Sequence, residues 1–140
     1  MLREKYMNLN YLNSLPEEKN RFKVELENGE KVVFTVKNIG FGRENHNIIC
    51  YQANFTVTNR RIITDTDNAV FAIDFADIVQ CKYFEDGKGI LANKGYEVIL
   101  KEPMECDSPN GTVMIPAFIF VFTQKKIMAR FREIAENVFI

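Results

Sequence analysis

The side chains that most often carry catalysis or hold metals are few and scattered in this sequence. His46 is the single histidine, and it lies in a polar stretch beside Glu44 and Asn47. A catalytic triad or a histidine metal site needs further groups within hydrogen-bond or ligand distance. The sequence also has no GxSxG, HExxH, CxxC or Walker spacing. We therefore expect no enzyme, and the sequence predicts no catalytic residue, no metal ligand and no cofactor.

Asp65 and Asp67 place carboxylates at alternate positions, as the start of a calcium-binding loop would. The third ligand position is Ala69, and neither the glycine nor the final glutamate of such a loop follows. A cluster of Asp, Thr and Asn is typical of a hairpin turn. We therefore predict a turn over residues 65–68.

Cys50, Cys81 and Cys106 form an odd set without a CxxC pair. Cys50 and Cys81 lie in apolar stretches with the pattern of strands. Disulfide scaffolds and zinc sites use cysteines in even numbers or at short spacings. The sequence therefore predicts buried thiols in a reducing compartment.

The chain has 18 basic and 19 acidic residues among 140, which gives a net charge of -1. It lacks the global positive field that draws proteins to nucleic acids, so no nucleic-acid partner is predicted. The longest apolar run, 115–122, contains Pro116 and is too short to span a bilayer. The N-terminal residues have no apolar core of a secretory signal. We therefore expect one soluble domain in the cytoplasm.

The elements that would position any site follow from the spacing of apolar residues. Phe22, Val24 and Leu26 alternate with polar residues, and the alternation resumes at Val32 after the turn signal Asn28-Gly29. This pattern predicts a hairpin that includes a strand over Phe22–Glu27, followed by a loop from Gly40 to Asn47. Further predicted strands cover residues 48–58, 61–64, 69–75, 78–84, 96–101 and 113–122.

Both ends of the chain show the three- and four-residue steps of helices. Leu2, Tyr6, Leu9 and Leu12 predict a short N-terminal helix that ends before Pro16. The C-terminal helix is predicted from an apolar stripe of four residues, namely Ile127, Phe131, Ile134 and Val138. On this helix the side chains expected in water are Lys126, Arg130, Glu133 and Asn137. Together with the strands, this stripe predicts an antiparallel β-sandwich or barrel of about seven strands, capped by the C-terminal helix.

Residues 55–63 (FTVTNRRII) resemble the strand-turn-strand signature of GRAM and bacterial pleckstrin-homology-like (PH-like) domains. Residues 29–34 (GEKVVF) resemble the opening strand of that family, and 117–138 its last strand and closing helix. The resemblance implies a PH-like domain over 22–140, preceded by an extension over 1–21, and a structural role for Arg61. The sequence departs from the family at Ala53-Asn54, where glycine is usual, and in its additional strand before residue 29.

The resemblance also implies where a ligand would bind. PH domains hold phosphoinositide headgroups at loops of the open end, which would place Gly40-Phe41-Gly42 there with Lys37 and Arg43 nearby and Glu44 opposing them. Lys125 and Lys126 begin the C-terminal helix, where positive charge opposes the helix dipole and suits an anionic partner. Lys37, Arg43, Lys125 and Lys126 are therefore the candidate contacts to an anion or to a membrane surface.

The segment 117–122 is apolar on both faces, which predicts cover on both sides. The phenylalanines can face the core, which leaves Ala117, Ile119 and Val121 either to the N-terminal segment or to an interface. Three hypotheses follow. The leading one is a non-catalytic binding or adaptor domain for a protein partner or a second copy of the chain. The alternatives are peripheral binding to anionic lipid and a carrier of a small ligand beneath the helix.

Overall fold

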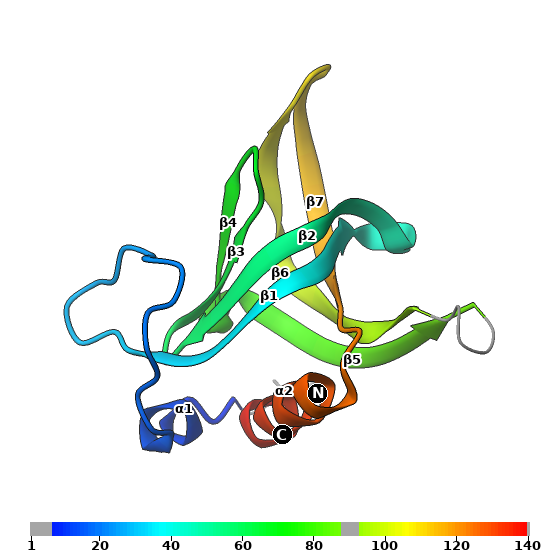
Figure 1. The fold of residues 1–140 in the computed structure, drawn as a ribbon. Helices are drawn as coiled ribbons and strands as arrows, with labels where there is room; N and C mark the ends of the chain where they lie inside the picture. Colours follow the sequence, from blue (N-terminus) through cyan, green and yellow to red (C-terminus); the bar gives the residue numbers. More distant parts are fainter. Residues whose placement is uncertain (1–6, 88–92, 140) are drawn as a thin grey trace, which may run out of the picture.

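The computed structural model describes residues 7–87 and 93–139 (Figure 1). These residues form one seven-stranded antiparallel sheet in the order β4-β3-β2-β1-β7-β6-β5. In chain order the strands are β1 (Val32–Arg43), β2 (Asn47–Thr58), β3 (Arg61–Asp65), β4 (Val70–Asp74), β5 (Ile78–Asp86), β6 (Asn93–Ser108) and β7 (Gly111–Val121). Two 3-10 turns, η1 (Glu44–His46) and η2 (Phe75–Asp77), lie between β1 and β2 and between β4 and β5. The predicted mainly β architecture is confirmed, with a sheet that does not close into a barrel.

The main core lies between the sheet and helix α2 (Lys125–Val138), which runs across one end of the strands (Figure 1). Phe131 is 1% exposed and packs against a ring of aromatic side chains from β1, β2, β6 and the end of β7. Its ring centroid lies 5.2 to 6.4 Å from those of Phe34, Phe55, Tyr96 and Phe122. Burial of each such ring contributes about 1.5–3 kcal/mol, so α2 is held by its apolar stripe.

The C-terminal helix predicted from the sequence is confirmed. Phe131, Ile134 and Val138 are buried and Ile127 is half-buried. The side chains predicted to face water do so, namely Lys126, Arg130, Glu133 and Asn137. No helix among the described residues is long and apolar enough to cross a membrane.

The strands predicted between residues 48 and 122 are found, although several end elsewhere. β6 and β7 continue to a tight turn at Pro109-Asn110 and form a long hairpin. The turn predicted over 65–68 is also present, because the Thr66 N–H donates to the Ala69 carbonyl at 2.9 Å. The hairpin β3–β4 and the hairpin β6–β7 both point away from α2 (Figure 1).

The strand predicted over Phe22–Glu27 is wrong. This segment pairs with no strand of the described chain, Lys23 within it has a positive φ of 54°, and only its closing turn at Asn28-Gly29 is as predicted. The Asn20 side chain binds both backbone groups of Val24, accepting from its N–H at 3.0 Å and donating to its carbonyl at 2.8 Å. The conformation of Lys23 and the contacts of Asn20 therefore keep the backbone out of a regular strand, although β7 pairs with β1 only over Gly40–Arg43.

The loop predicted around Gly40 and Gly42 is also wrong, because both lie inside β1. They pair with Val121 and Ile119 of β7, at the point where β1 joins the two halves of the sheet. A Cβ atom at Gly42 would lie 2.4 Å from the Asn47 carbonyl oxygen. These glycines therefore permit close approach of backbones and do not mark a loop.

The N-terminal helix is confirmed in part as α1 (Asn10–Ser14), while Leu2 and Tyr6 lie outside the described residues. Leu12 is fully buried in the main core. The segment before α1 lies along the end of α2, where the Asn8 N–H donates to the Val138 carbonyl at 2.8 Å. The described part of the predicted extension is therefore packed onto the rest of the chain.

The apolar face predicted as an interface is not open. Ala117, Ile119 and Val121 are 6%, 0% and 7% exposed. Ile119 and Val121 form a second small core with Phe84 of β5, and Ile48 of β2 packs against it. The prediction of an interface there is corrected, because side chains of the chain's own sheet, and not α1, fill this face.

Candidate functional site

The residues of the predicted signature form a buried ion-pair network where β2 turns into β3. The Glu30 carboxylate accepts from Arg61 Nε at 2.9 Å and Nη2 at 3.0 Å, and from the Thr58 hydroxyl at 2.6 Å. Thr58 Oγ1 in turn accepts from the backbone N–H groups of Arg60 and Arg61. The Glu30 side chain is 0% exposed, so the carboxylate depends on these donors instead of water.

Burial acts to raise the pKa of Glu30, but hydrogen bonds from Arg61, Thr58 and the Glu27 N–H together lower it below its ordinary value. The same contact raises the pKa of Arg61. Both groups are therefore charged at neutral pH. Arg61 is bound within the chain, in agreement with the structural role that the resemblance implies.

Asn59 extends this network to the N-terminal segment. Its side chain accepts from the Lys31 N–H at 2.9 Å and donates to Asn13 Oδ1 at 2.9 Å. The Lys31 ammonium donates to the carbonyl oxygens of Asn13 and Leu15 at 2.8 and 2.7 Å. The side chains of Asn59 and Lys31 therefore hold α1 and the residues that follow it against the β2–β3 turn.

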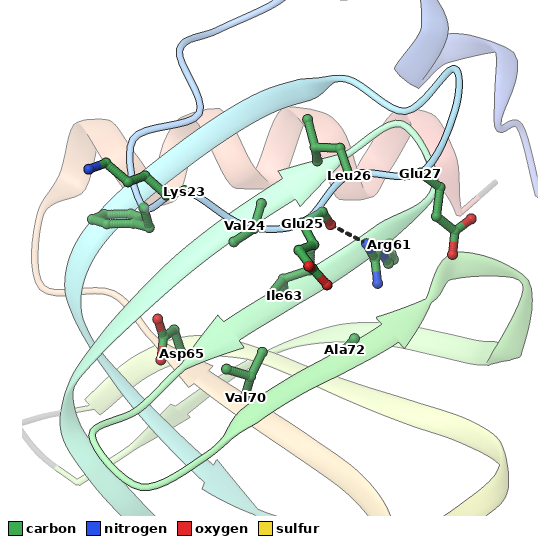
Figure 2. Close-up of a pocket in the computed structure, with 11 residues that line it drawn as sticks. Lys23, Val24, Glu25, Leu26, Glu27, Arg61, Ile63, Asp65, Val70 and Ala72 are labelled. Atoms are coloured by element: carbon green, nitrogen blue, oxygen red, sulfur yellow. Dashed lines mark hydrogen bonds between the residues drawn. The ribbon is translucent and has the colours of Figure 1, made fainter.

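A hollow of about 630 Å³ lies beside this network, between the segment 22–27 and the strands β3 and β4 (Figure 2). Figure 2 shows Arg61 on its wall, bonded to the Glu25 carbonyl, with Ile63 and Val70 beyond. Glu25, Glu27 and Asp65 on this wall outnumber its cations, and Arg61 is already paired with Glu30. The hollow therefore presents charges of both signs with an excess of carboxylates, and it has no concentration of positive charge for an anion.

A second surface feature is a groove between β5 and α2, which we call the β5–α2 groove. Arg132 of α2 crosses it, donating to the Tyr96 hydroxyl at 3.2 Å, with its guanidinium 5.4 Å from the centroid of the Tyr83 ring. Tyr83 and Arg132 border a hollow on each side. Burial raises the pKa of Tyr96, so its hydroxyl stays protonated, and the contact with Tyr96 raises the pKa of Arg132.

The hollow toward the start of α2 has a volume of about 690 Å³. Among the residues that the structure describes, it is lined by Lys94, Lys125 and Arg132 but by no acidic side chain. Lys94 Nζ lies 3.6 Å from Glu85 Oε1, an exposed pair that leaves it accessible. Gln124, which precedes α2, makes no capping hydrogen bond with its side chain. The unpaired N–H groups of the first helical turn add to the positive potential here. We call this part the basic hollow.

The hollow toward the end of α2 measures about 360 Å³. Its lining combines Cys81, Ala135 and Phe139 with the charged Arg132 and Glu136. The Phe139 ring also lies 6.0 Å from that of Phe75. We call this part the C-terminal hollow.

β5 forms one edge of the sheet and, among the described residues, pairs only with β6. Tyr83 of this strand is 42% exposed. The groove therefore combines an edge strand, an aromatic surface and a concentration of positive charge.

No family model matches the sequence, and no curated protein does. Among solved structures the chain is similar to the Vps36 N-terminal PH domain, with a TM-score of 0.60 and 17% identity over 87% of this chain and 88% of that one. The chain has a PH-like fold. The finer assignment to GRAM or bacterial PH-like proteins stays a prediction, because a likeness at this identity concerns the fold alone.

In this PH-like fold the end away from α2 is acidic, contrary to what a phosphate site needs. Arg43 at the end of β1 donates from Nε to Glu44 Oε1 at 3.1 Å, which raises the pKa of Arg43 and lowers that of Glu44. Four further carboxylates lie on the hairpins β3–β4 and β6–β7, namely Asp65, Asp67, Glu105 and Asp107. The positive charge of Arg43 is therefore matched within the chain.

The four predicted anion contacts do not form one cluster. Lys37 is exposed in the middle of β1, while Arg43 pairs with Phe118 of β7. Lys125 and Lys126 are exposed neighbours on the first turn of α2, but only Lys125 lines the basic hollow. Among the described residues, no hydrogen bond or ion pair joins these lysines to Lys37 or Arg43.

The sequence did not point to the other residues of the β5–α2 groove. Tyr83, Lys94 and Arg132 come from β5, β6 and α2, and none belongs to a local motif. Of the residues of the groove, the sequence indicated Lys125, because it lies at the start of a predicted helix. The three cysteines form no disulfide and are half-buried instead of fully buried as predicted.

Proposed function

We propose that the chain is a non-catalytic binding module that takes an extended segment of a partner protein into the β5–α2 groove. The observation that carries this proposal is the exposed pair Tyr83 and Arg132 between β5 and α2, beside a hollow lined by Lys94 and Lys125. A segment that lies in the groove can pack on the Tyr83 ring, and its acidic side chains can accept hydrogen bonds from the lysines.

A separate protein is favoured over a second copy of the chain. Self-association was predicted through Ile119 and Val121, whose burial removes the apolar surface on which that hypothesis rested. A small ligand beneath α2 is likewise disfavoured, because Phe131 and the rings around it fill that space. The groove, in contrast, is open to solvent at Tyr83 and Arg132.

Anionic lipid is the second candidate, and the basic hollow supports it. A membrane surface would contact the exposed Lys125 and Lys126 together, since both lie on the first turn of α2. A segment in the groove would contact Lys125 and not Lys126, because only Lys125 lines the hollow. Substitution of each lysine by glutamate therefore separates the two functions.

The proposal can be tested with a display library of random peptides selected on the folded chain. Peptides that bind in the groove should lose binding to Ala129→Trp, because Ala129 lines the basic hollow and is exposed enough to accept a larger side chain. Asn137→Trp is the matched control, since Asn137 is exposed on α2 outside both hollows. A library without enriched peptides, or enriched peptides that bind Ala129→Trp normally, would overturn the proposal.

A further inference from the structure

The basic hollow gathers positive charge from elements that are far apart in the sequence. Lys94 comes from β6, while Lys125 and Arg132 lie about two turns apart on α2. Among the described residues no carboxylate lines this hollow. Glu85 pairs with Lys94 from outside at 3.6 Å, and Glu136 lines the C-terminal hollow instead. Three cations therefore border one space, which concentrates positive potential there.

The hollow also offers more hydrogen-bond donors than a carboxylate can use. The bond from Arg132 to the Tyr96 hydroxyl is made by Nε, and a guanidinium has four further N–H donors on its terminal nitrogens. Asn93 and Thr123 add an exposed amide and an exposed hydroxyl to the lining. Thr123 leads into the first turn of α2, whose N–H groups have no cap from the side chain of Gln124. A phosphate monoester, with three acceptor oxygens and a charge of about -1.5 to -2, matches such a set of donors.

The size and the walls of the hollow fit a phosphate that is attached to a side chain. Its volume of about 690 Å³ falls within the range of about 300–1,000 Å³ that is usual for ligand pockets. Carbon surface comes from Met128 and Ala129 of α2 and from the Tyr83 ring. The stem of a phosphorylated side chain can pack on this surface while its phosphate contacts the cations, whereas a free phosphate ion would leave the carbon surface uncovered.

A membrane lipid also carries phosphate, but the surface around the hollow suits a membrane less well. Anionic membranes hold proteins through clusters of about four to eight Lys and Arg. The first turn of α2 exposes two such residues, Lys125 and Lys126, and Arg132 lies within the groove beside Tyr83. The chain as a whole has a net charge of -1 and is not drawn to a negative surface. A protein segment is therefore the favoured carrier of the phosphate.

We infer that the partner segment carries a phosphorylated serine, threonine or tyrosine whose phosphate binds in the basic hollow. The phosphate accepts hydrogen bonds from Lys94, Lys125 and Arg132, and its stem packs against Tyr83. This inference rests on the function proposed above and adds its regulation, because phosphorylation of the partner then strengthens binding. An Asp or Glu at the same position binds more weakly, since it has one negative charge and two oxygens.

Two small compounds test the site without any partner sequence. Methyl phosphate and phenyl phosphate carry an aliphatic and an aromatic stem, and acetate supplies a carboxylate for comparison. At constant ionic strength, at least one of the two phosphates should shift the amide NMR signals of Asn93, Lys94, Thr123 and Lys125 with an affinity about tenfold higher than that of acetate. Equal affinity for acetate, or shifts spread over the whole surface, would overturn the inference.

Peptides connect the site to the proposed function. A peptide enriched in the display selection is synthesised with phosphoserine, phosphothreonine or phosphotyrosine in place of each Asp or Glu in turn. At least one version should bind about tenfold more tightly than the parent in fluorescence anisotropy, and phosphatase treatment should remove the gain. Enriched peptides without acidic residues, or no gain from any phosphorylated version, would overturn the inference and leave a peptide groove in place.

Charge reversal in the protein supplies the reciprocal test. Lys125→Glu should weaken binding of the phosphorylated peptide by about tenfold. Lys126→Glu is the matched control and should weaken it by less than about twofold, since Lys126 lies outside the hollow. Both substitutions place acid at the start of α2, where it favours the helix, so loss of folding cannot explain a difference between them. Equal weakening by the two substitutions would contradict binding in the hollow.

The outcomes separate the two proposals. Failure of every displayed peptide to bind would overturn the proposed function and with it the inference, even where methyl phosphate binds. A library of bound peptides that gain nothing from phosphorylation would overturn the inference alone. Vesicles that contain phosphatidylserine or a phosphoinositide supply the last comparison. Binding to them that is weakened equally by Lys125→Glu and Lys126→Glu, without any gain from phosphorylated peptides, would assign the basic surface to a membrane instead.

Discussion

Replacement of Arg61 by methionine should destabilise the protein because it leaves the buried Glu30 carboxylate without its charged partner. Methionine keeps the unbranched apolar stem of arginine but removes both guanidinium bonds to Glu30, at 2.9 and 3.0 Å, and the bond to the Glu25 carbonyl at 2.7 Å. Only the Thr58 hydroxyl and the Glu27 N–H would remain to Glu30. Removing one partner of a buried pair costs about 3–5 kcal/mol. We expect about 3 kcal/mol, the lower end, because the Arg61 side chain is 19% exposed.

The effect should depend on pH in a defined direction. The pKa of Glu30 is lowered in the folded chain, so its stabilising contribution is complete above the ordinary glutamate value of about 4.3 and is lost as the pH falls through the lower folded value. In Arg61→Met the burial remains while the arginine bonds are gone, so the pKa of Glu30 should rise. Glu30 then takes up a proton at higher pH, so the deficit of the variant should begin to shrink already above the ordinary glutamate value of about 4.3.

Urea unfolding followed by circular dichroism, at neutral pH and near pH 4, measures both effects. The control is Arg60→Met, because Arg60 is the adjacent arginine, with a side chain 47% exposed and paired with Glu27, which is 65% exposed. Such a surface pair contributes about 0–1 kcal/mol. A loss at Arg61 no larger than the loss at Arg60, or a deficit that stays constant between the two pH values, would refute the reasoning.

Three further substitutions test the packing. Gly95→Ala should cost more than about 3 kcal/mol or prevent folding, seen in thermal denaturation, because the new Cβ would lie 1.8 Å from the Phe120 carbonyl oxygen. Phe131→Ala should cost about 3–5 kcal/mol in urea unfolding, because it empties the centre of the aromatic core beneath α2. Asn59→Ala should cost about 1–3 kcal/mol, because the Lys31 N–H loses its acceptor, and should speed amide exchange in α1.

Each of these substitutions has a control on an exposed residue of the same or a similar element. Asn93→Ala on β6, Asn137→Ala on α2 and Asn68→Ala in the β3–β4 turn should each change the free energy of unfolding by less than about 0.5 kcal/mol. Gly95→Ala with normal stability would mean that β6 and β7 can separate without cost. Unchanged exchange in α1 after Asn59→Ala would mean that Leu12 and the Lys31 ammonium hold this helix without Asn59.

The helix α2 and most strands were predictable because their signal is local. Phe131 and Ile134 lie three residues apart in one helical stripe, which needs no knowledge of what covers it. The segment 22–27 has the same kind of local signal for a strand and yet forms none. Its alternation indicates that one side is apolar, but a strand also needs a regular extended backbone. Here Lys23 has a positive φ, and the Asn20 side chain binds the backbone of Val24 instead.

The residues that bury Ile119 could not be predicted from its neighbours along the chain. Phe84 and Ile48 fill this face, and they lie on β5 and β2, far from β7 in sequence. The two-sided apolar pattern correctly indicated burial on both faces but could not name the partner. The loop predicted at Gly40 and Gly42 was wrong for a related reason. A glycine permits either a loop or a close approach between two strands, and only the β1–β7 contact shows which of the two occurs here.

The amino-acid composition could not indicate the β5–α2 groove, because the net charge sums the charges of the whole surface. The net charge of -1 combines an end of the sheet that carries Asp65, Asp67, Glu105 and Asp107 with a groove that carries Lys94, Lys125 and Arg132. A potential of either sign acts over about 8–10 Å at physiological ionic strength, so each surface acts on a partner separately. An acidic segment is attracted at the groove and repelled at the hairpin end. The same separation explains why the phosphate site implied by the resemblance and the surface that suits an anion lie on different parts of the molecule.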